Sequence, residues 1–91
     1  MAKTKTKDKK VKPGSLPQWK VLLHKDDIHS VETIRETILS LTRLPIDDAQ
    51  KCAEEVHSTG VSVVLVTHKE KAELYQELFE GKDIKSTIEP N

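Results

Sequence analysis

The sequence predicts a small α+β fold, in which a three-stranded sheet and three helices form a β-α-α-β-α-β sandwich. Three observations predict it. Short apolar runs are typical of strands, and the stretches between them repeat apolar residues at helical spacing. Glycine or proline stands at several of the boundaries, where it ends or starts an element. The chain has 91 residues, which makes one domain at most.

The first strand and the first helix are expected within residues 19–43. A run of three apolar side chains predicts a strand at 19–24, and the polar stretch 25–29 predicts a loop after it. Ser30 is a suitable N-cap for a helix that should end near Arg43. The buried face of this helix is marked by apolar residues at helical spacing: Val31, Ile34, Ile38 and Leu41.

The second helix is expected between Pro45, which suits the start of a helix, and Gly60, which suits a left-handed residue after its end. Asp47 and Asp48 would lie in its first turn, where the helix dipole favours negative charge. The side chains expected to face the core form one stripe: Ile46, Ala49, Cys52, Ala53 and Val56.

Two further strands and a third helix complete the prediction. Residues 61–67 are β-branched and almost wholly apolar, so we expect them to form the central strand of the sheet. A helix over 69–80 should follow, capped by residue 67 or 68 and ended by Gly81. The last strand is expected at 84–88. The inward side chains of the third helix are expected to be Ala72, Tyr75, Leu78 and Phe79.

The charge is divided unevenly along the chain. Residues 1–17 hold six lysines and one aspartate, so 6 − 1 = +5, while residues 18–91 hold nine basic and fourteen acidic side chains, so 9 − 14 = −5. We expect a disordered basic tail at 1–17, ahead of a single folded domain at 18–91. A lysine-rich tail can bind nucleic acid, but an acidic domain disfavours it, so no nucleic-acid partner is expected.

Composition also narrows the class of protein. A single cysteine, Cys52, excludes an intramolecular disulfide and indicates a reducing compartment. No apolar run approaches the roughly 18 residues of a membrane span, and the tail has no apolar segment of a secretory signal. We therefore expect a cytoplasmic protein without a membrane partner. Scattered glycines form no phosphate-binding loop and no nucleophile motif is present, so neither an enzyme nor a cofactor is expected.

Two adjacent carboxylates, Asp26 and Asp27, follow the first strand. They could form a turn with an Asx-type hydrogen bond to the next helix, or they could bind a cationic ligand. If the strand continued, the two would point to opposite faces, so only one could meet a given ligand. A hydrolytic acid pair is disfavoured because its members come from separate segments.

Histidines are candidate ligands in two places. His24 and His29 flank the two aspartates, but the spacing does not suit a four-ligand zinc site, and no metal is expected. His57 lies near the predicted end of the second helix, where it could cap the helix or contact a ligand.

From Trp19 to about Pro90 the chain resembles the ClpS family, adaptors that deliver proteins with a particular N-terminal residue to Clp unfoldases. The resemblance consists of an aromatic-Lys-Val-x-Leu strand that runs into a double aspartate, and of a Val-His-x-x-Gly motif at the end of the second helix. The matching positions are Trp19, Lys20, Val21, Leu23, Asp26, Asp27, Glu32, Ala49, Val56, His57 and Gly60.

The resemblance implies a pocket for a bulky apolar N-terminal residue. Its α-ammonium group would be bound by Asp26 with Asp27 and His57. Lys25 departs from the asparagine that the family usually has before the two aspartates, and a lysine directed inward would repel an ammonium. The walls for the substrate side chain would be Val31, Ile34, Ala53 and Val56. The alternative is a divergent interaction module of the same shape that has lost α-amine recognition.

The resemblance also implies a second partner, the N-terminal domain of a Clp AAA+ unfoldase. The family docks it with a face near the start of the third helix, where Glu70 matches a charged residue and Tyr75 stands where a lysine is often found. The protein is expected to act as a monomer.

Overall fold

The computed structural model describes residues 17–91 and has the predicted α+β fold, a three-stranded sheet with three helices. The predicted tail at 1–17 lies outside the described residues except for Pro17. No helix in the described part of the chain is long and apolar enough to cross a membrane. The elements in chain order are β1 (Gln18–His24), α2 (Val31–Leu41), α3 (Ile46–Thr59), β2 (Val61–His68), α4 (Lys69–Glu80) and β3 (Ser86–Pro90).

The sheet has the order β2-β1-β3, and β1 is antiparallel to both neighbours. The prediction that residues 61–67 form the central strand is therefore wrong. β1 is central, and its side chains Val21 and Leu23 are fully buried, whereas Val63 and Val66 on the edge strand β2 are 41% and 44% exposed. A β-branched composition favours the strand conformation, but it does not decide which strand gains a neighbour on each side.

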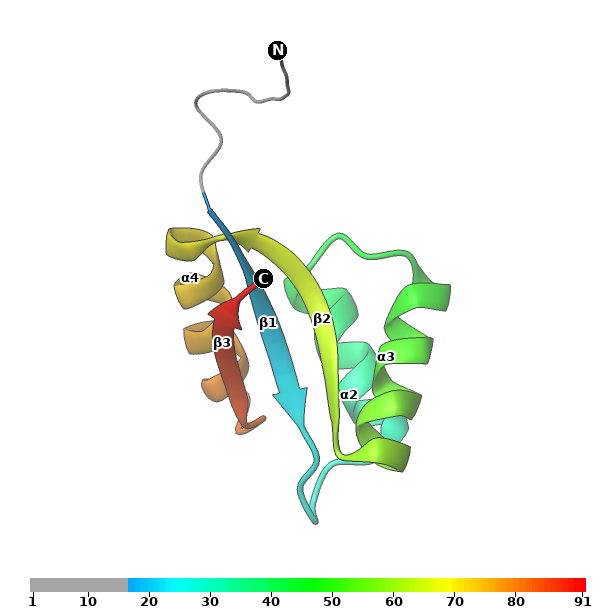
Figure 1. Ribbon diagram of the computed structural model, residues 1–91. Helices are drawn as coiled ribbons and strands as arrows, with labels where there is room; N and C mark the ends of the chain where they lie inside the picture. Colours follow the sequence, from blue (N-terminus) through cyan, green and yellow to red (C-terminus); the bar gives the residue numbers. More distant parts are fainter. Residues whose placement is uncertain (1–16) are drawn as a thin grey trace.

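The helices cover the sheet in two groups (Figure 1). α4 packs against β1 and β3, while α2 and α3 pack against each other and α3 lies along β2. Burial of the apolar side chains between sheet and helices supplies the main stabilisation of so small a domain. The core consists of Val21, Leu23, Ile34, Ile38, Ala49, Cys52, Ala53, Val56, Val64, Ala72, Phe79 and Ile84.

Three predicted helix boundaries are confirmed. Ser30 caps α2, because its hydroxyl accepts a hydrogen bond from the backbone N–H of Thr33 at 3.1 Å. His68 caps α4 by accepting from the N–H of Lys71 at 3.4 Å. Gly60 ends α3 in the left-handed conformation, with φ of +96°.

Three boundaries differ from the prediction by two residues each: the end of α2 and both ends of β3, which ends at Pro90 and not at residue 88. α2 ends at Leu41 and not near Arg43, because the backbone of the C-cap residue Thr42 is extended, with φ of −125° and ψ of 177°. The Thr42 hydroxyl and N–H both donate to the carbonyl of Ile38 at this end of the helix. β3 begins at Ser86 and not at residue 84. Residues 81–85 form the connection from α4, and Asp83 has a positive φ of 63° that no strand accommodates.

Two side chains expected in the core are exposed. Ile46 is 61% exposed because it is the first residue of α3 and precedes the turn that meets the core. Leu78 is 38% exposed, since its neighbour Phe79 takes the buried position of α4. A helical stripe predicted from apolar residues alone is therefore slightly too wide.

Candidate functional site

The loop between β1 and α2 is tied to the end of α3 by backbone hydrogen bonds. The N–H of Lys25 donates to the carbonyl of Gly60 at 2.9 Å, directly after β1 ends at His24. Gly60 follows the last turn of α3, which carries His57. Two segments that lie some thirty residues apart in the sequence are thus joined at one end of the sheet (Figure 1).

Asp26 shapes this loop with both of its carboxylate oxygens. Oδ1 accepts hydrogen bonds from the backbone N–H groups of Ile28 at 3.0 Å and His29 at 2.8 Å. Oδ2 lies 2.6 Å from Nδ1 of the His29 ring. This is the Asx-type turn that was one of the two predicted roles of the acid pair. Because β1 has already ended, the two aspartates do not alternate across a strand.

The surroundings of Asp26 favour its ionised form. Desolvation by burial acts to raise the pKa of this carboxyl, but the hydrogen bonds from the His29 side chain and from the backbone N–H groups of His29 and Ile28 outweigh it. The pKa of Asp26 is therefore lowered from its usual range. Asp26 carries a negative charge whose hydrogen-bonding capacity is largely used within the loop.

The other three candidate side chains, Asp27, Lys25 and His57, are free by comparison. Asp27, Lys25 and His57 are all exposed, and no side-chain hydrogen bond or ion pair joins any of them to another described residue. The structure thus places Asp27 and Lys25 on one loop and His57 on the adjoining end of α3. Asp27 is the carboxylate with both oxygens open to a ligand.

The four predicted wall residues lie together between α2 and α3, in the core or against it. Ile34 is 3% exposed, and Ala53 and Val56 are fully buried. Val31 is half-buried and is the member of the set nearest the surface. Apolar side chains therefore lie beside the loop, and most of them are buried.

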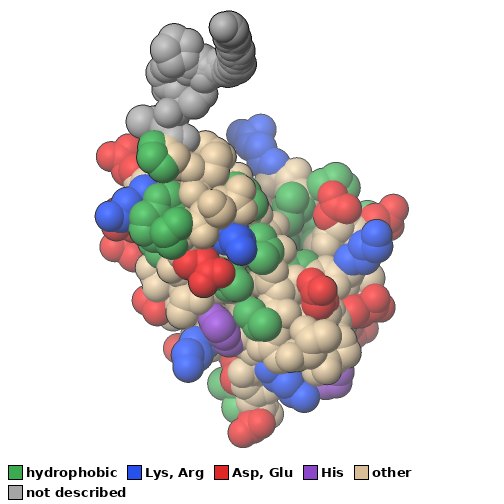
Figure 2. Space-filling view, in the orientation of Figure 1, with side chains coloured by type: hydrophobic (Ala, Val, Ile, Leu, Met, Phe, Trp, Pro, Cys, Tyr) green, Lys and Arg blue, Asp and Glu red, His purple; other side chains and the backbone are tan. Residues whose placement is uncertain are grey.

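A groove of about 830 Å³ lies at the opposite end of β1, around the start of α4. Lys69 Nζ sits 5.1 Å from the centre of the Trp19 ring, a cation–π contact. Figure 2 shows hydrophobic, basic and acidic side chains side by side over this end of the molecule, at the upper left of the view. The groove is lined by Pro17, Trp19, His68, Lys69, Glu70, Glu73 and Pro90.

Of the groove residues at the start of α4, the family resemblance named Glu70 as part of a docking face and did not name Lys69 or Glu73. Antiparallel pairing of the first two strands would have predicted that these residues lie near Trp19. In an antiparallel pair, the start of β1 lies beside the end of β2, and α4 begins where β2 ends. Trp19 therefore had to lie near the first turn of α4.

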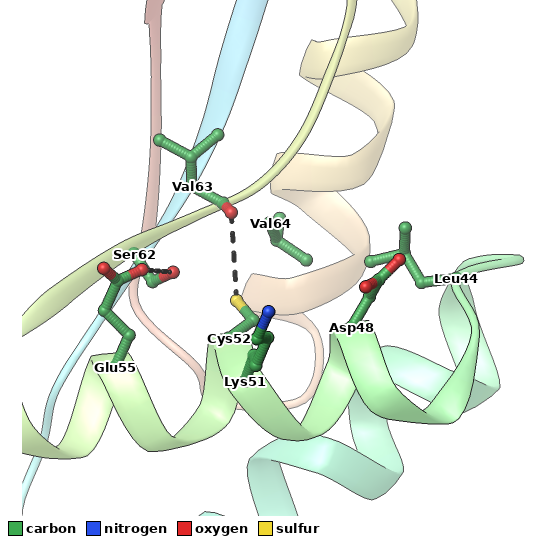
Figure 3. A pocket seen from close by; sticks show the side chains of 8 residues that line it. All are labelled: Leu44, Asp48, Lys51, Cys52, Glu55, Ser62, Val63 and Val64. Atoms are coloured by element: carbon green, nitrogen blue, oxygen red, sulfur yellow. Dashed lines mark hydrogen bonds between the residues drawn. The ribbon is translucent and has the colours of Figure 1, made fainter.

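A second hollow, of about 450 Å³, lies between α3 and β2 (Figure 3). It contains Cys52, whose Sγ lies 4.0 Å from the carbonyl of Val63, and the hydrogen bond from the Ser62 hydroxyl to Glu55 at 2.5 Å. Burial raises the pKa of the Cys52 thiol, so the sulfur stays protonated and is a poor nucleophile. Cys52 packs as a core residue, as its helical position predicted.

The histidines that were weighed as metal ligands have other partners. His24 Nε2 lies 2.8 Å from the hydroxyl of Thr87 on β3, and His29 faces Asp26. Among residues 17–91 there is no group of three or more histidine, cysteine, aspartate or glutamate side chains that could hold a metal ion.

Comparison with known proteins gives a consistent result. Residues 15–87 match the family of ATP-dependent Clp protease adaptor proteins ClpS. The chain is 40% identical over 75 residues to the ClpS adapter protein of Synechococcus sp. (strain CC9902), covering 81% of this chain and 72% of that protein. It is 34% identical over 84 residues to the ClpS adapter of Gloeobacter violaceus, covering 91% and 90%.

A chloroplast relative and a solved structure extend the comparison. The chloroplastic Clp protease adapter of Chlamydomonas reinhardtii is 37% identical over 75 residues. The match covers 81% of this chain and 46% of that protein. The structure of Agrobacterium tumefaciens ClpS2 bound to L-phenylalaninamide superimposes with a TM-score of 0.74 at 25% identity, covering 85% of this chain and all of that one.

Fold and site together define a small α+β protein-interaction module, with a structured loop at one end of its central strand and a shallow groove at the other. The chain belongs to the ClpS family, the adaptor proteins of the ATP-dependent Clp protease.

Proposed function

We propose that this adaptor binds substrate proteins through a free, bulky apolar N-terminal residue and delivers them to a Clp AAA+ unfoldase. The observation that carries the proposal is the ligand of the similar Agrobacterium structure, L-phenylalaninamide. This molecule has a free α-amine and a large apolar side chain, and its carboxyl group is blocked as an amide. It therefore has the chemistry of the first residue of a polypeptide.

The loop after β1 supplies the groups that an α-ammonium needs. Asp27 offers an exposed carboxylate, and a hydrogen bond from a charged nitrogen to a carboxylate is roughly twice as strong as a neutral one. Asp26 contributes negative charge while its oxygens hold the loop. His57 adjoins them on α3. The exposed Lys25 side chain turns to solvent in this proposal, since a cation about 4 Å from the ammonium would cost roughly 1–4 kcal/mol.

The side chain of the first substrate residue would enter between α2 and α3. Val31, at the surface, would open onto the buried Ile34, Ala53 and Val56. Full burial of an apolar side chain contributes roughly 1.5–3 kcal/mol. Val31 and Ala53 stand at positions where ClpS proteins often have a larger residue such as methionine. The pocket would therefore be wider and would accept large or β-branched first residues.

The unfoldase would dock at the other end of β1. Glu70 lies in the groove around the start of α4, beside Trp19 and Lys69. We assign this groove to the N-terminal domain of the Clp ATPase. In this proposal the adaptor acts as a monomer in the cytoplasm and has no catalytic activity of its own. The compartment is open to test, because the relatives include both bacterial and chloroplast proteins.

The test is fluorescence anisotropy with labelled peptides that differ in residue one: Leu, Phe, Trp, Tyr, Ile, Val or Ala. Each peptide is measured with a free and with an acetylated N-terminus, because acetylation removes the charge. Micromolar or tighter binding is expected for free peptides with bulky first residues. Equal binding of free and acetylated peptides, or none, would contradict α-amine recognition.

A second candidate function is a divergent module that keeps the fold and has lost the amine site. Two observations favour it: Lys25 brings positive charge to the loop, and the oxygens of Asp26 are already engaged. Such a module would bind another partner through its surface and show no preference among the peptides.

A further inference from the structure

One ring in the loop, His29, is held in a defined protonation pattern by its neighbour. The side chains of His29 and Asp26 are only 11% and 25% exposed, and Nδ1 lies 2.6 Å from Asp26 Oδ2. The lowered pKa of Asp26 keeps that carboxyl ionised. An ionised carboxylate can only accept hydrogen bonds. Nδ1 of His29 must therefore carry the proton that it donates to Asp26.

The other ring nitrogen is left as an acceptor. In a neutral imidazole one nitrogen donates and the other accepts, so a protonated Nδ1 leaves a lone pair on Nε2. Nε2 of His29 has no hydrogen-bond partner among the described residues. No buried side-chain nitrogen or oxygen in that part of the chain lacks a partner, so Nε2 must reach the surface. His29 thus presents one open acceptor from a mostly buried ring.

The ring is also fixed in place. The backbone N–H of His29 donates to Asp26 Oδ1 at 2.8 Å, and the next residue, Ser30, caps α2. The loop itself is anchored to the end of α3 through Lys25 and Gly60. A group held in this way loses little conformational entropy when it binds a ligand.

The other three histidines differ from His29. His24 Nε2 faces the Thr87 hydroxyl, which can donate or accept and therefore does not fix which ring nitrogen is protonated. His68 uses Nδ1 as the acceptor that caps α4. His57 is exposed and has no neighbour that fixes its ring. His29 is the histidine of this chain that combines an oriented ring with an open acceptor.

We infer that His29 Nε2 accepts a hydrogen bond from the α-ammonium group of the substrate, and that Asp26 is the positioning residue that keeps it an acceptor. The inference rests on the proposed function and deepens it. The Lys25 side chain can only donate hydrogen bonds, so it cannot accept one from an ammonium group. His29 supplies an acceptor from the same loop. The three N–H groups of the ammonium would then meet His29, Asp27 and His57.

The protonation pattern can be measured without any ligand. Nitrogen NMR of the imidazole rings in the full chain should show His29 protonated at Nδ1 and unprotonated at Nε2, at the pH of the binding assay. Asp26→Asn should reverse this pattern. Its amide oxygen can still accept from the loop N–H groups, while its NH₂ group donates to Nδ1 and drives the proton to Nε2. Wild-type protein with a proton on Nε2 would overturn the inference.

Binding of a free and an acetylated Phe-peptide supplies the second readout. His29→Phe keeps the aromatic ring and removes the acceptor, so affinity for the free peptide should fall about tenfold or more, as expected for a hydrogen bond to a charged group. Asp26→Asn should cause a loss of similar size. Ile28→Ala is the matched control in the same loop, since that side chain is 77% exposed and should leave affinity unchanged.

The outcomes separate the two proposals. If wild-type protein ignores acetylation, the proposed function fails and this inference falls with it. If wild-type protein binds only the free peptide, while folded His29→Phe and Asp26→Asn bind it equally well, only the role of His29 is overturned. Thermal unfolding of each variant shows that it is folded. If His29→Phe does not fold, the His29 Nε2 resonance of the wild-type protein gives the answer, because the free Phe-peptide should shift it and the acetylated peptide should not.

Discussion

The two ends of β1 carry surfaces of different kinds. Where the strand ends, hydrogen bonds from Asp26 and a backbone bond from Lys25 to Gly60 hold a short loop in one shape. Where it begins, Trp19 lies under the Lys69 ammonium in a broad groove with acidic side chains on its rim. The first end presents a few polar atoms at fixed positions, while the second presents a larger mixed surface.

The difference indicates what each end can recognise. Fixed acceptors suit a small charged group such as an α-ammonium, whose three donors have a set geometry. A shallow groove with an aromatic residue and charges suits a protein surface. β1 has seven residues and so separates the two ends by roughly 20 Å. Substrate and unfoldase could therefore bind together without overlapping.

The largest effect is expected from Leu23→Ala, which acts on both ends at once. Leu23 is fully buried in the central strand, and removing such a side chain costs about 2–5 kcal/mol of the free energy of unfolding. Urea unfolding measures the loss, and affinities for peptide and for the Clp N-terminal domain should decline together as the folded fraction falls. Leu22→Ala, at a half-buried neighbouring position, should cost clearly less.

The next largest effect is expected from Asp27→Asn, which should weaken binding at the loop end of β1 and leave the groove end unchanged. It removes the charge of an exposed carboxylate in the loop, so we expect affinity for a free N-terminal Phe-peptide to fall by about 1.5–3 kcal/mol. Stability and unfoldase binding should not change. Asp47→Asn, at the start of α3, makes the same chemical change away from the loop and should leave peptide affinity intact. Equal losses in both variants would mean that only net charge matters.

The fold could largely be predicted because its signals are local. The caps at Ser30 and His68 and the left-handed Gly60 depend on residues within one or two turns, and all three were confirmed. The order of strands could not be predicted in the same way. Which strand is central depends on pairing between distant segments, and the apolar character of residues 61–67 was mistaken for a central position.

Gly60→Ala tests how far the loop depends on the end of α3. A side chain at φ of +96° costs about 1–2 kcal/mol, although a Cβ there would meet no atom within 4 Å. Calorimetry should show that loss, with a smaller decline in peptide affinity, because the Gly60 carbonyl anchors Lys25. Gly81→Ala is the matched control. That glycine has φ of −63°, so alanine should be neutral or stabilise by about 0.4–1 kcal/mol.

The loop that carries the two aspartates could be predicted from the sequence, but the contacts of each aspartate could not. Two adjacent aspartates at a strand end indicated a turn or a ligand site, and the contacts assign the turn to Asp26 and leave Asp27 open. No sequence pattern separates the two, since they have the same side chain. The pairing of Asp26 with His29 depends on the path of the loop. That path follows from the anchor at Gly60, far away in the sequence.

The smallest effect is expected at the groove, from Lys69→Ala. An exposed cation–π contact contributes about 0.5–1 kcal/mol, so removing the ammonium above Trp19 should weaken unfoldase docking by no more than a few-fold and leave peptide affinity unchanged. Trp19 is the only tryptophan of the chain and reports on the groove through its fluorescence. In wild-type protein, adding the Clp N-terminal domain should change that emission, and adding the peptide should not.

Lys71→Ala is the matched control, because Lys71 is an exposed lysine on the same helix that does not line the groove. It should bind the unfoldase domain like the wild type. A peptide that alters Trp19 emission as strongly as the unfoldase domain does would show that the two ends are coupled. The separation of roles along β1 would then be wrong, because a rigid central strand between independent surfaces transmits no such change.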